Sequence, residues 1–291
     1  MTTSILTTNK SGSQPFIEKY QIPIFFLLVL GLTWPFLILE VLASRGLLPF
    51  EPPMALMIVQ GFMPGLAAVI VAGLTQGRQG IRNLFRKLLI ARVGWQWYAV
   101  AIFGLAGICI AAVLLSNQFG TSPALPVLST KMPSDTGSIG LLINIVILFI
   151  IPLLFNSEEL AWRGFALPRL QAKYNALTSS LILSIPWLLF HLPLFFKLGS
   201  SQAEMSFFSY AFQIAGMSVL FTWMFNNTRG SVLLAHILHA SMNVWTQIFS
   251  IDPTNDFQFW VLNGLFAIAA VIVVIAAGPE HLSRRNVRVQ E

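Results

Sequence analysis

The stretch that decides both fold and chemistry is Asn156-Ser157-Glu158-Glu159-Leu160-Ala161-Trp162-Arg163-Gly164-Phe165, which directly follows the apolar run 139–155. Ser157 is a good N-cap for a helix that starts here, and acidic residues in a first turn suit the helix dipole. On a helix, Glu159 and Arg163 share a face and can pair, whereas Glu158 lies about 100° round and lacks that partner. The stretch is either a solvated helix start at a membrane edge, or a held carboxylate beside one free to exchange protons.

The composition around this stretch is that of a membrane protein. Of 291 residues, 56% are hydrophobic and 10% are charged. Several apolar runs reach the roughly 20 residues that cross a bilayer as a helix, and they are continuous rather than alternating, which disfavours a β-barrel. The sequence therefore predicts an all-α, polytopic membrane bundle of about eight transmembrane helices. The predicted spans are 22–43, 53–74, 95–116, 139–155, 176–196, 206–225, 231–249 and 257–277.

The basic residues are distributed unevenly between the two sides of this bundle. An even number of spans puts both termini on one side, which then receives fourteen of the 17 Lys and Arg residues, whereas the other side receives Arg45, Lys131 and Lys197. The positive-inside rule places both termini in the cytoplasm of a protein of the cell membrane. We expect a polar cytoplasmic N-terminus (1–20), a single transmembrane domain (21–278) and a basic cytoplasmic tail (279–291).

Three further features limit the possible functions. The net charge of +6 is typical of loops that face anionic lipid, so no nucleic-acid partner is expected. The segment 78–93 interleaves basic and apolar residues at helical spacing, which predicts an amphipathic helix on the inner membrane surface, or alternatively a docking site for an acidic partner. The single cysteine, Cys109, excludes an intrachain disulfide, and Glu40 is interpreted as an isolated structural or interfacial carboxylate.

Three of the four histidines lie inside predicted spans, where ionisable groups are costly and usually face an interior cavity. His191 lies between two prolines that should kink its span and free carbonyls near it. His239 and Asn243 form an i,i+4 pair on one face of the span 231–249, and His236 shares that face. A single intramembrane histidine often only bridges helices through a hydrogen bond, and His236 is interpreted in that way. The fourth, His281, is expected to be solvated in the tail.

The motifs in these stretches resemble one known family. Glu158-Glu159-x-x-x-Arg163 is similar to the EExxxR motif of the CPBP family, also called the ABI family, of CAAX-processing and bacteriocin-processing intramembrane endopeptidases, which includes Rce1-like proteases. The run from His239 to Asn243 matches the family's HxxxN motif. Trp187-x-x-x-His191 matches its FxxxH motif, with Trp in place of Phe. The resemblance runs from about residue 20 to 250, with a core at about 139–250.

This resemblance implies an all-helical endopeptidase whose site opens toward the cytoplasm and which cleaves a peptide or a membrane-protein tail. In the family, the first Glu and the middle His activate water, and the last His and Asn hold the oxyanion. Those roles would fall on Glu158, His191, His239 and Asn243. The spacing agrees, because Glu159 is tied to Arg163 while Glu158 is left to act as the base. The expected partners are a peptide or membrane-protein substrate and membrane lipid.

Metal dependence and two other functions stay open at this point. Glu158, His191 and His239 would make a zinc site of the open catalytic kind, and the family has been described both as metalloproteases and as metal-free glutamate-type proteases. The alternatives are a non-catalytic membrane scaffold or bacteriocin-immunity protein of the same fold, and a proton-coupled transporter. The intact motif set favours the protease over the scaffold, and the lack of inverted repeats disfavours the transporter.

Overall fold

The computed structural model describes residues 15–119, 137–249, 251, 254–284 and 288–290, and all regular structure within these ranges is helical. Lys131, expected on the non-cytoplasmic side, lies outside the described residues. The predicted all-α fold is confirmed. The helices are α1 (Phe16–Lys19), α2 (Gln21–Ser44), α3 (Met54–Arg86), η1 (Lys87–Leu89), α4 (Trp95–Gln118), α5 (Gly137–Phe155), η2 (Leu160–Ala166), α6 (Leu167–Gln171), α7 (Ala176–Phe190), η3 (Leu192–Phe196), α8 (Ser201–Glu204), α9 (Phe207–Asn227), α10 (Val232–Ile248) and α11 (Asp256–Ala277).

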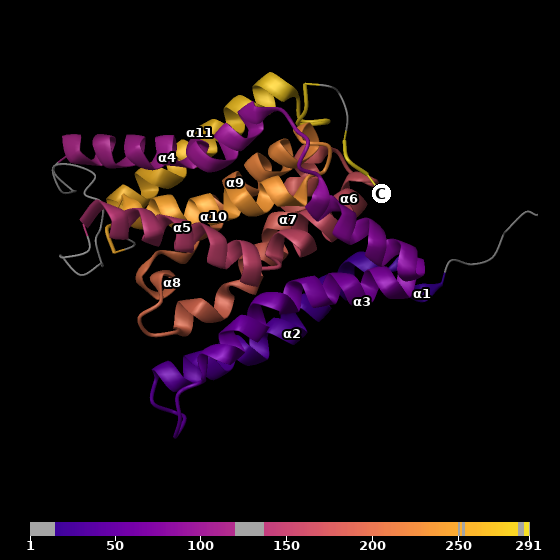
Figure 1. Ribbon diagram of the computed structural model, residues 1–291, viewed down its shortest axis with the longest axis horizontal. Coiled ribbons are helices and arrows are strands. Elements are labelled where there is room, and N and C mark those ends of the chain that lie inside the picture. The colour runs from indigo at the N-terminus through magenta and orange to yellow at the C-terminus, as the bar shows by residue number, and fades with distance from the viewer. Residues whose placement is uncertain (1–14, 120–136, 250, 252–253, 285–287, 291) are drawn as a thin grey trace, which may run out of the picture.

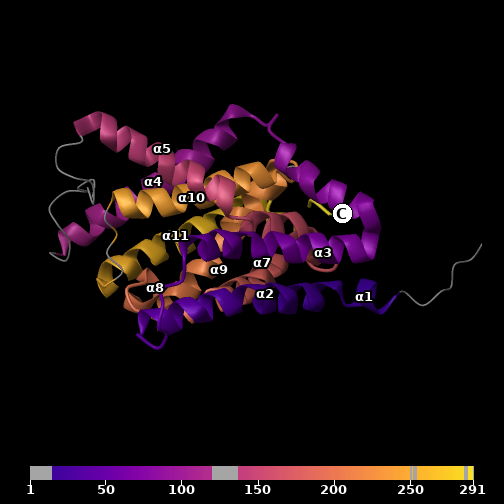
Figure 2. The same ribbon diagram turned by 60° about the horizontal axis from the view of Figure 1, so that its bottom comes forward.

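The long helices lie side by side along the long axis of the molecule (Figures 1 and 2). Helices α2 and α3 form a pair along one flank, and α11 packs on α9 and α4. Helix α10 contacts α4, α5 and α9, whereas α7 contacts α9 and α2. The short η2 contacts α3, α7, α9 and α10. The glutamate segment is therefore surrounded by helices from both halves of the chain.

Each of the eight predicted spans coincides with a helix, but not every one of these helices is long enough to cross a bilayer alone. Helices α2, α3, α4, α9 and α11 are long and apolar enough, and α5 with η2 and α6 forms a bent pair that would make a sixth span. Helix α7 has 15 residues and α10 has 17. Seventeen residues rise only about 26 Å, less than the hydrocarbon core of about 30 Å. The protein is thus a multi-pass membrane protein, while the count of eight stays a prediction.

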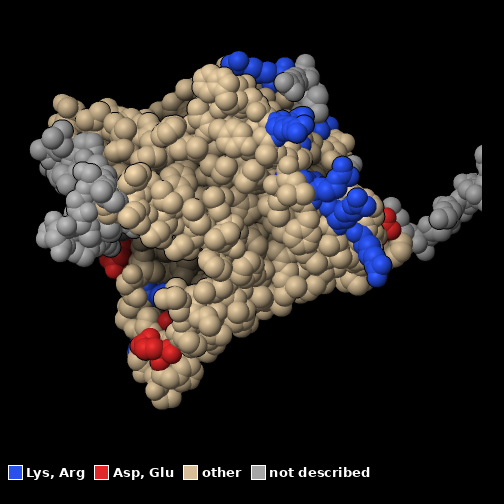
Figure 3. All heavy atoms as spheres, in the orientation of Figure 1, with Lys and Arg blue, Asp and Glu red and all other residues tan. Residues whose placement is uncertain are grey.

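Most of the Lys and Arg side chains on the face shown in Figure 3 gather at one end of the molecule. Several of them follow a bend in α3 at Gly77, where φ is 62°, a value that favours glycine. Beyond the bend, helical structure continues through Arg86 to Leu89, with Gly80 and Leu84 buried and the arginines exposed. The predicted basic amphipathic helix is therefore present, but it ends four residues before its predicted limit.

The side chain of Ser157 joins α3 to the segment that follows α5. Its Oγ accepts a hydrogen bond from Gly65 N at 2.8 Å, and both Ser157 N and Ser157 Oγ donate to Gly61 O, at 2.9 and 2.8 Å. In an uninterrupted α-helix, Gly61 O and Gly65 N would bond to each other, so Ser157 is inserted between them. The expectation that Ser157 caps the next helix is wrong, because its hydroxyl bonds to α3. Asn156 Oδ1 accepts from Glu158 N instead, at 2.7 Å.

We expect Gly61→Ala to destabilise the protein by about 3 kcal/mol, because overpacking of a close helix contact forces the backbones apart. A Cβ added at Gly61 would overlap the carbonyl oxygen of Phe155. Gly107→Ala in α4 is the matched control, since an added Cβ there meets no atom within 4 Å. That control should be neutral or stabilising by about 0.5–1 kcal/mol. Thermal unfolding in detergent measures both, and equal melting temperatures would contradict the close contact.

Glu40, which was expected to be isolated, and His281, which was expected to be solvated, both contact other parts of the fold. Glu40 Oε2 pairs with Lys197 Nζ at 2.6 Å, so α2 is tied to the segment after η3. His281 is half-buried rather than solvated. Its carbonyl accepts from Asn226 Nδ2 at 2.8 Å, which docks the start of the tail on the end of α9.

Candidate active site

The segment that carries the two glutamates is bent and buried. Helix α5 ends at Phe155, and the axis of Leu160–Gln171 makes an angle of 47° with the second half of α5. The first part of this second helix, η2, is a π-helix in which all seven residues are buried. The sequence spacing predicted an ordinary α-helix here. A π-turn contains an extra residue and is found frequently at functional sites.

Glu159 lies at the centre of a buried charge cluster. Its Oε1 accepts a hydrogen bond from Arg163 Nη1 at 3.0 Å and lies 2.8 Å from His239 Nδ1. The Glu159 and Arg163 side chains have no exposure to solvent. The predicted Glu159–Arg163 ion pair is therefore confirmed. The contact with His239, which lies 80 residues away, is additional, because the sequence linked His239 only to Asn243.

The guanidinium of Arg163 is enclosed between two aromatic rings. Its Cζ lies 4.2 Å from the ring centroid of Trp187 on α7 and 4.2 Å from that of Phe221 on α9. A desolvated cation over an aromatic face gains about 2 kcal/mol. Arg163 Nε and Nη2 have no hydrogen-bond partner within the described residues, so the Glu159 contact and the two ring faces hold the charge.

The carboxylate of Glu158 is held by three N–H groups. Asn156 Nδ2 donates to Oε1 at 3.1 Å, while the indole nitrogens of Trp162 and Trp187 donate to Oε2 at 3.2 and 3.0 Å. The sequence correctly gave Glu158 no arginine partner in an ion pair, but it missed all three donors. The signals were present in the sequence: Asn156 is an Asx cap two residues earlier, and Trp187 stands where the family motif has Phe.

His191 is the C-cap residue of α7, one turn after Trp187, whose indole donates to the Glu158 carboxylate. Its Nδ1 lies 3.0 Å from the carbonyl oxygen of Trp187, so Nδ1 carries the proton and donates. This leaves Nε2 as the nitrogen that can accept a hydrogen bond. Glu158 interacts electrostatically with both His191 and His239, so the three groups belong to one cluster. The His191 ring also packs edge-on against Tyr210 of α9, at 5.7 Å between centroids.

Two further polar residues of α10, Asn243 and His236, differ in their hydrogen bonds. Asn243 lies one turn after His239, half-buried, and its side chain forms no hydrogen bond within the described part of the chain. His236 has one nitrogen 3.1 Å from Val232 O and the other 2.9 Å from Asn156 O. His236 therefore bridges α10 to the Asn156 backbone, as its interpretation as a helix-bridging residue proposed.

The candidate zinc ligands do not fit a metal site as they lie. Across the described residues, no three or more His, Cys, Asp or Glu side chains are grouped so that they could hold a metal ion. His239 directs Nδ1 at Glu159, and the Glu158 oxygens already accept three N–H donors.

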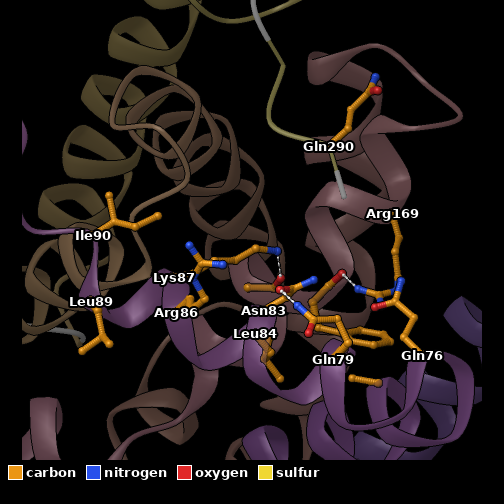
Figure 4. Close-up of a pocket in the computed structure, with 14 residues that line it drawn as sticks. Gln76, Gln79, Asn83, Leu84, Arg86, Lys87, Leu89, Ile90, Arg169 and Gln290 are labelled. Carbon is orange, nitrogen blue, oxygen red and sulfur yellow. Dashed lines mark hydrogen bonds between the residues drawn. The ribbon is translucent and has the colours of Figure 1, made fainter.

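A cavity of about 760 Å³ lies on another side of η2, at the basic end of the molecule. It is lined by Gly164 and Phe165 and by α3 and η1 residues that include Arg86 and Lys87, and by none of the six candidate site residues. Lys87 Nζ donates to the carbonyl oxygen of Gly164 at 2.6 Å (Figure 4). This contact fastens the C-terminal half of η2 to the basic end of α3.

Comparison with known proteins agrees with the motifs at this cluster. Residues 137–245 match the family described as Type II CAAX prenyl endopeptidase Rce1-like, and this region holds all six candidate residues. The chain is also 28% identical over 227 residues to the protein named CAAX prenyl protease 2 of Methanococcus maripaludis, which covers 73% of this chain and 80% of that relative. The chain is therefore similar to Rce1-like CAAX prenyl endopeptidases, which agrees with the resemblance of its three motifs to the CPBP family.

Proposed function

We propose that the chain hydrolyses a bond in a peptide or in the tail of a membrane protein, with Glu158 and His191 activating the attacking water. The observation that carries this proposal is one buried cluster built from three separate parts of the chain. Glu158 and Glu159 directly precede η2 and Arg163 lies within it, while His191 comes from the end of α7 and His239 from α10. A scaffold of the same fold has no need for this costly arrangement of buried charge.

The hydrogen bonds on Glu158 support its role as the base. A carboxylate has about four lone-pair sites. The indole N–H groups of Trp162 and Trp187 occupy both lone-pair sites of Oε2, and Asn156 Nδ2 occupies one site of Oε1. One lone-pair site on Oε1 is therefore left to accept a proton from water. His191 orients the same water through Nε2 while Nδ1–H donates to Trp187 O. The water oxygen attacks the scissile carbonyl carbon, and Glu158 then gives the proton to the leaving amine.

His239 and Asn243 would stabilise the oxyanion of the tetrahedral intermediate. When protonated on both nitrogens, His239 keeps its Nδ1 hydrogen bond to Glu159 and presents Nε2–H as a donor. The Asn243 side chain has no hydrogen bond within the described residues, so its amide is able to donate beside His239. Two such donors aimed at a developing charge commonly supply a large part of the catalysis.

The decisive experiment is cleavage of peptides by the purified full-length protein in lipid nanodiscs. Because the Methanococcus maripaludis relative is named a CAAX prenyl protease, the substrates are matched peptides that end in Cys-Ala-Ala-X-type sequences, with and without a prenyl group on the cysteine. We expect cleavage of at least one set, unchanged in an His281→Ala control outside the cluster. Adding a metal chelator tests for metal dependence, since loss of activity and its recovery with zinc would assign a ligand role to Glu158, His191 and His239. No cleavage of either set would contradict the proposal.

The proposed orientation places both termini and the basic end of the molecule in the cytoplasm. The gathering of Lys and Arg at one end supports it through the positive-inside rule. A reporter domain fused after Gln290 is expected to lie in the cytoplasm, and one fused after Leu47, between α2 and α3, on the opposite side. A fusion after Gln290 that reports the non-cytoplasmic side would overturn the orientation.

A further inference from the structure

We infer that Trp187 is a positioning residue: its indole N–H, with that of Trp162, occupies Oε2 of Glu158 and selects Oε1 as the oxygen that takes the proton from water. The inference rests on the proposed role of Glu158 as the base. It goes beyond the motif, where this position holds the aromatic residue before the middle histidine. The family's phenylalanine has a ring at this position but no N–H.

The two carboxylate oxygens of Glu158 have different hydrogen-bond partners, which gives them different roles. Trp187 Nε1 lies 3.0 Å from Oε2 and Trp162 Nε1 lies 3.2 Å from the same atom. Both rings are fully buried, so these N–H groups have no water to bind and must find an acceptor in the protein. Their two hydrogen bonds fill Oε2 and fix the rotation of the carboxylate. Oε1, which accepts only from Asn156, is the oxygen left to react.

The same indole also contacts the other half of the cluster. The Trp187 ring face lies 4.2 Å from Cζ of Arg163, the partner of Glu159, and its main-chain oxygen accepts from His191. Tryptophan offers the strongest cation–π face of the aromatic residues. Trp187 therefore touches the base, the arginine and the middle histidine, each through a different group.

These separate contacts predict separable effects. Trp187→Phe keeps a ring over Arg163 but removes the N–H together with part of the indole ring, so we expect kcat to fall about tenfold with KM within twofold, and a fall in melting temperature smaller than that of Trp187→Leu. Trp187→Leu removes the ring face as well and should lower the melting temperature together with kcat. Benzothienylalanine at position 187, which replaces the indole N–H by sulfur in a ring of almost the same size, should reproduce the Phe result.

Trp34→Phe is the matched control, because Trp34 Nε1 is buried with no hydrogen-bond partner in the described residues. It should leave kcat unchanged. A second readout needs no activity: in ¹⁵N-tryptophan spectra, Glu158→Gln should shift the indole N–H signals of Trp162 and Trp187 and leave that of Trp34 in place.

The outcomes separate this inference from the proposed function. If the wild type cleaves peptide and Glu158→Gln is inactive, but Trp187→Phe keeps its full kcat, the positioning role is refuted and the protease mechanism stands. If Trp187→Phe loses melting temperature as much as Trp187→Leu does, the residue is structural. If the indole N–H signals of Trp162 and Trp187 do not shift in the Glu158→Gln variant, the two hydrogen bonds to Glu158 are absent, whatever the activity of that variant.

Discussion

Glu158→Gln is expected to lower kcat about 10²–10⁴-fold, the range that a positioned general base supplies, while the protein still inserts and purifies. The amide that replaces the carboxylate cannot take a proton from water. It also meets three N–H donors with one oxygen, so one NH₂ group must face a donor. We therefore expect a modest fall in melting temperature beside the loss of turnover, which peptide cleavage and thermal unfolding measure separately.

Glu204→Gln is the control for this variant, because it neutralises an exposed carboxylate on α8. It should change neither kcat nor melting temperature. A Glu158→Gln protein that cleaves peptide at the wild-type rate would remove Glu158 from the mechanism.

Glu159→Gln should instead strongly lower the free energy of unfolding. Its carboxylate is the charge partner of fully buried Arg163 and the acceptor for His239 Nδ1. Breaking a buried ion pair by removing one partner leaves an uncompensated charge and costs about 3–5 kcal/mol. The two aromatic rings beside Arg163 offset only part of that cost. We expect a large drop in melting temperature, with activity lost through misfolding.

The control is Glu280→Gln, since the Glu280–Arg288 pair has side-chain exposures of 58% and 22%. Exposed pairs are worth about 0–1 kcal/mol, so its melting temperature should barely change. Should Glu159→Gln be stable but inactive while Glu158→Gln cleaves, the roles of the two glutamates would be exchanged.

The sequence predicted those parts of the fold that depend on apolar runs and local spacing. The helical class, the position of each long helix and the Glu159–Arg163 pair follow from the hydropathy and from i,i+4 geometry. It also singled out His191 and His239, because polar groups inside spans are costly and seldom accidental.

What it could not predict depends on tertiary packing. The Glu159–His239 contact and the Trp187–Glu158 hydrogen bond join residues far apart in the chain. Ser157 has the residue type of a helix cap, yet glycines on α3 let it approach close enough to bond there instead. Apolar spacing likewise gives no signal of the π-helix, whose seven residues are all buried.

That π-helix makes the length of its segment part of the site. Deleting one residue within Leu160–Ala166 would allow a regular α-helical turn to form. Because a π-turn takes up its extra residue locally, the helix beyond the deletion would keep nearly its present direction. Arg163, if it lies beyond the deletion, would follow Glu159 by three residues instead of four, which changes how its guanidinium enters the space between Trp187 and Phe221. The effect of such a deletion would therefore fall on the charge cluster rather than on the helices that follow.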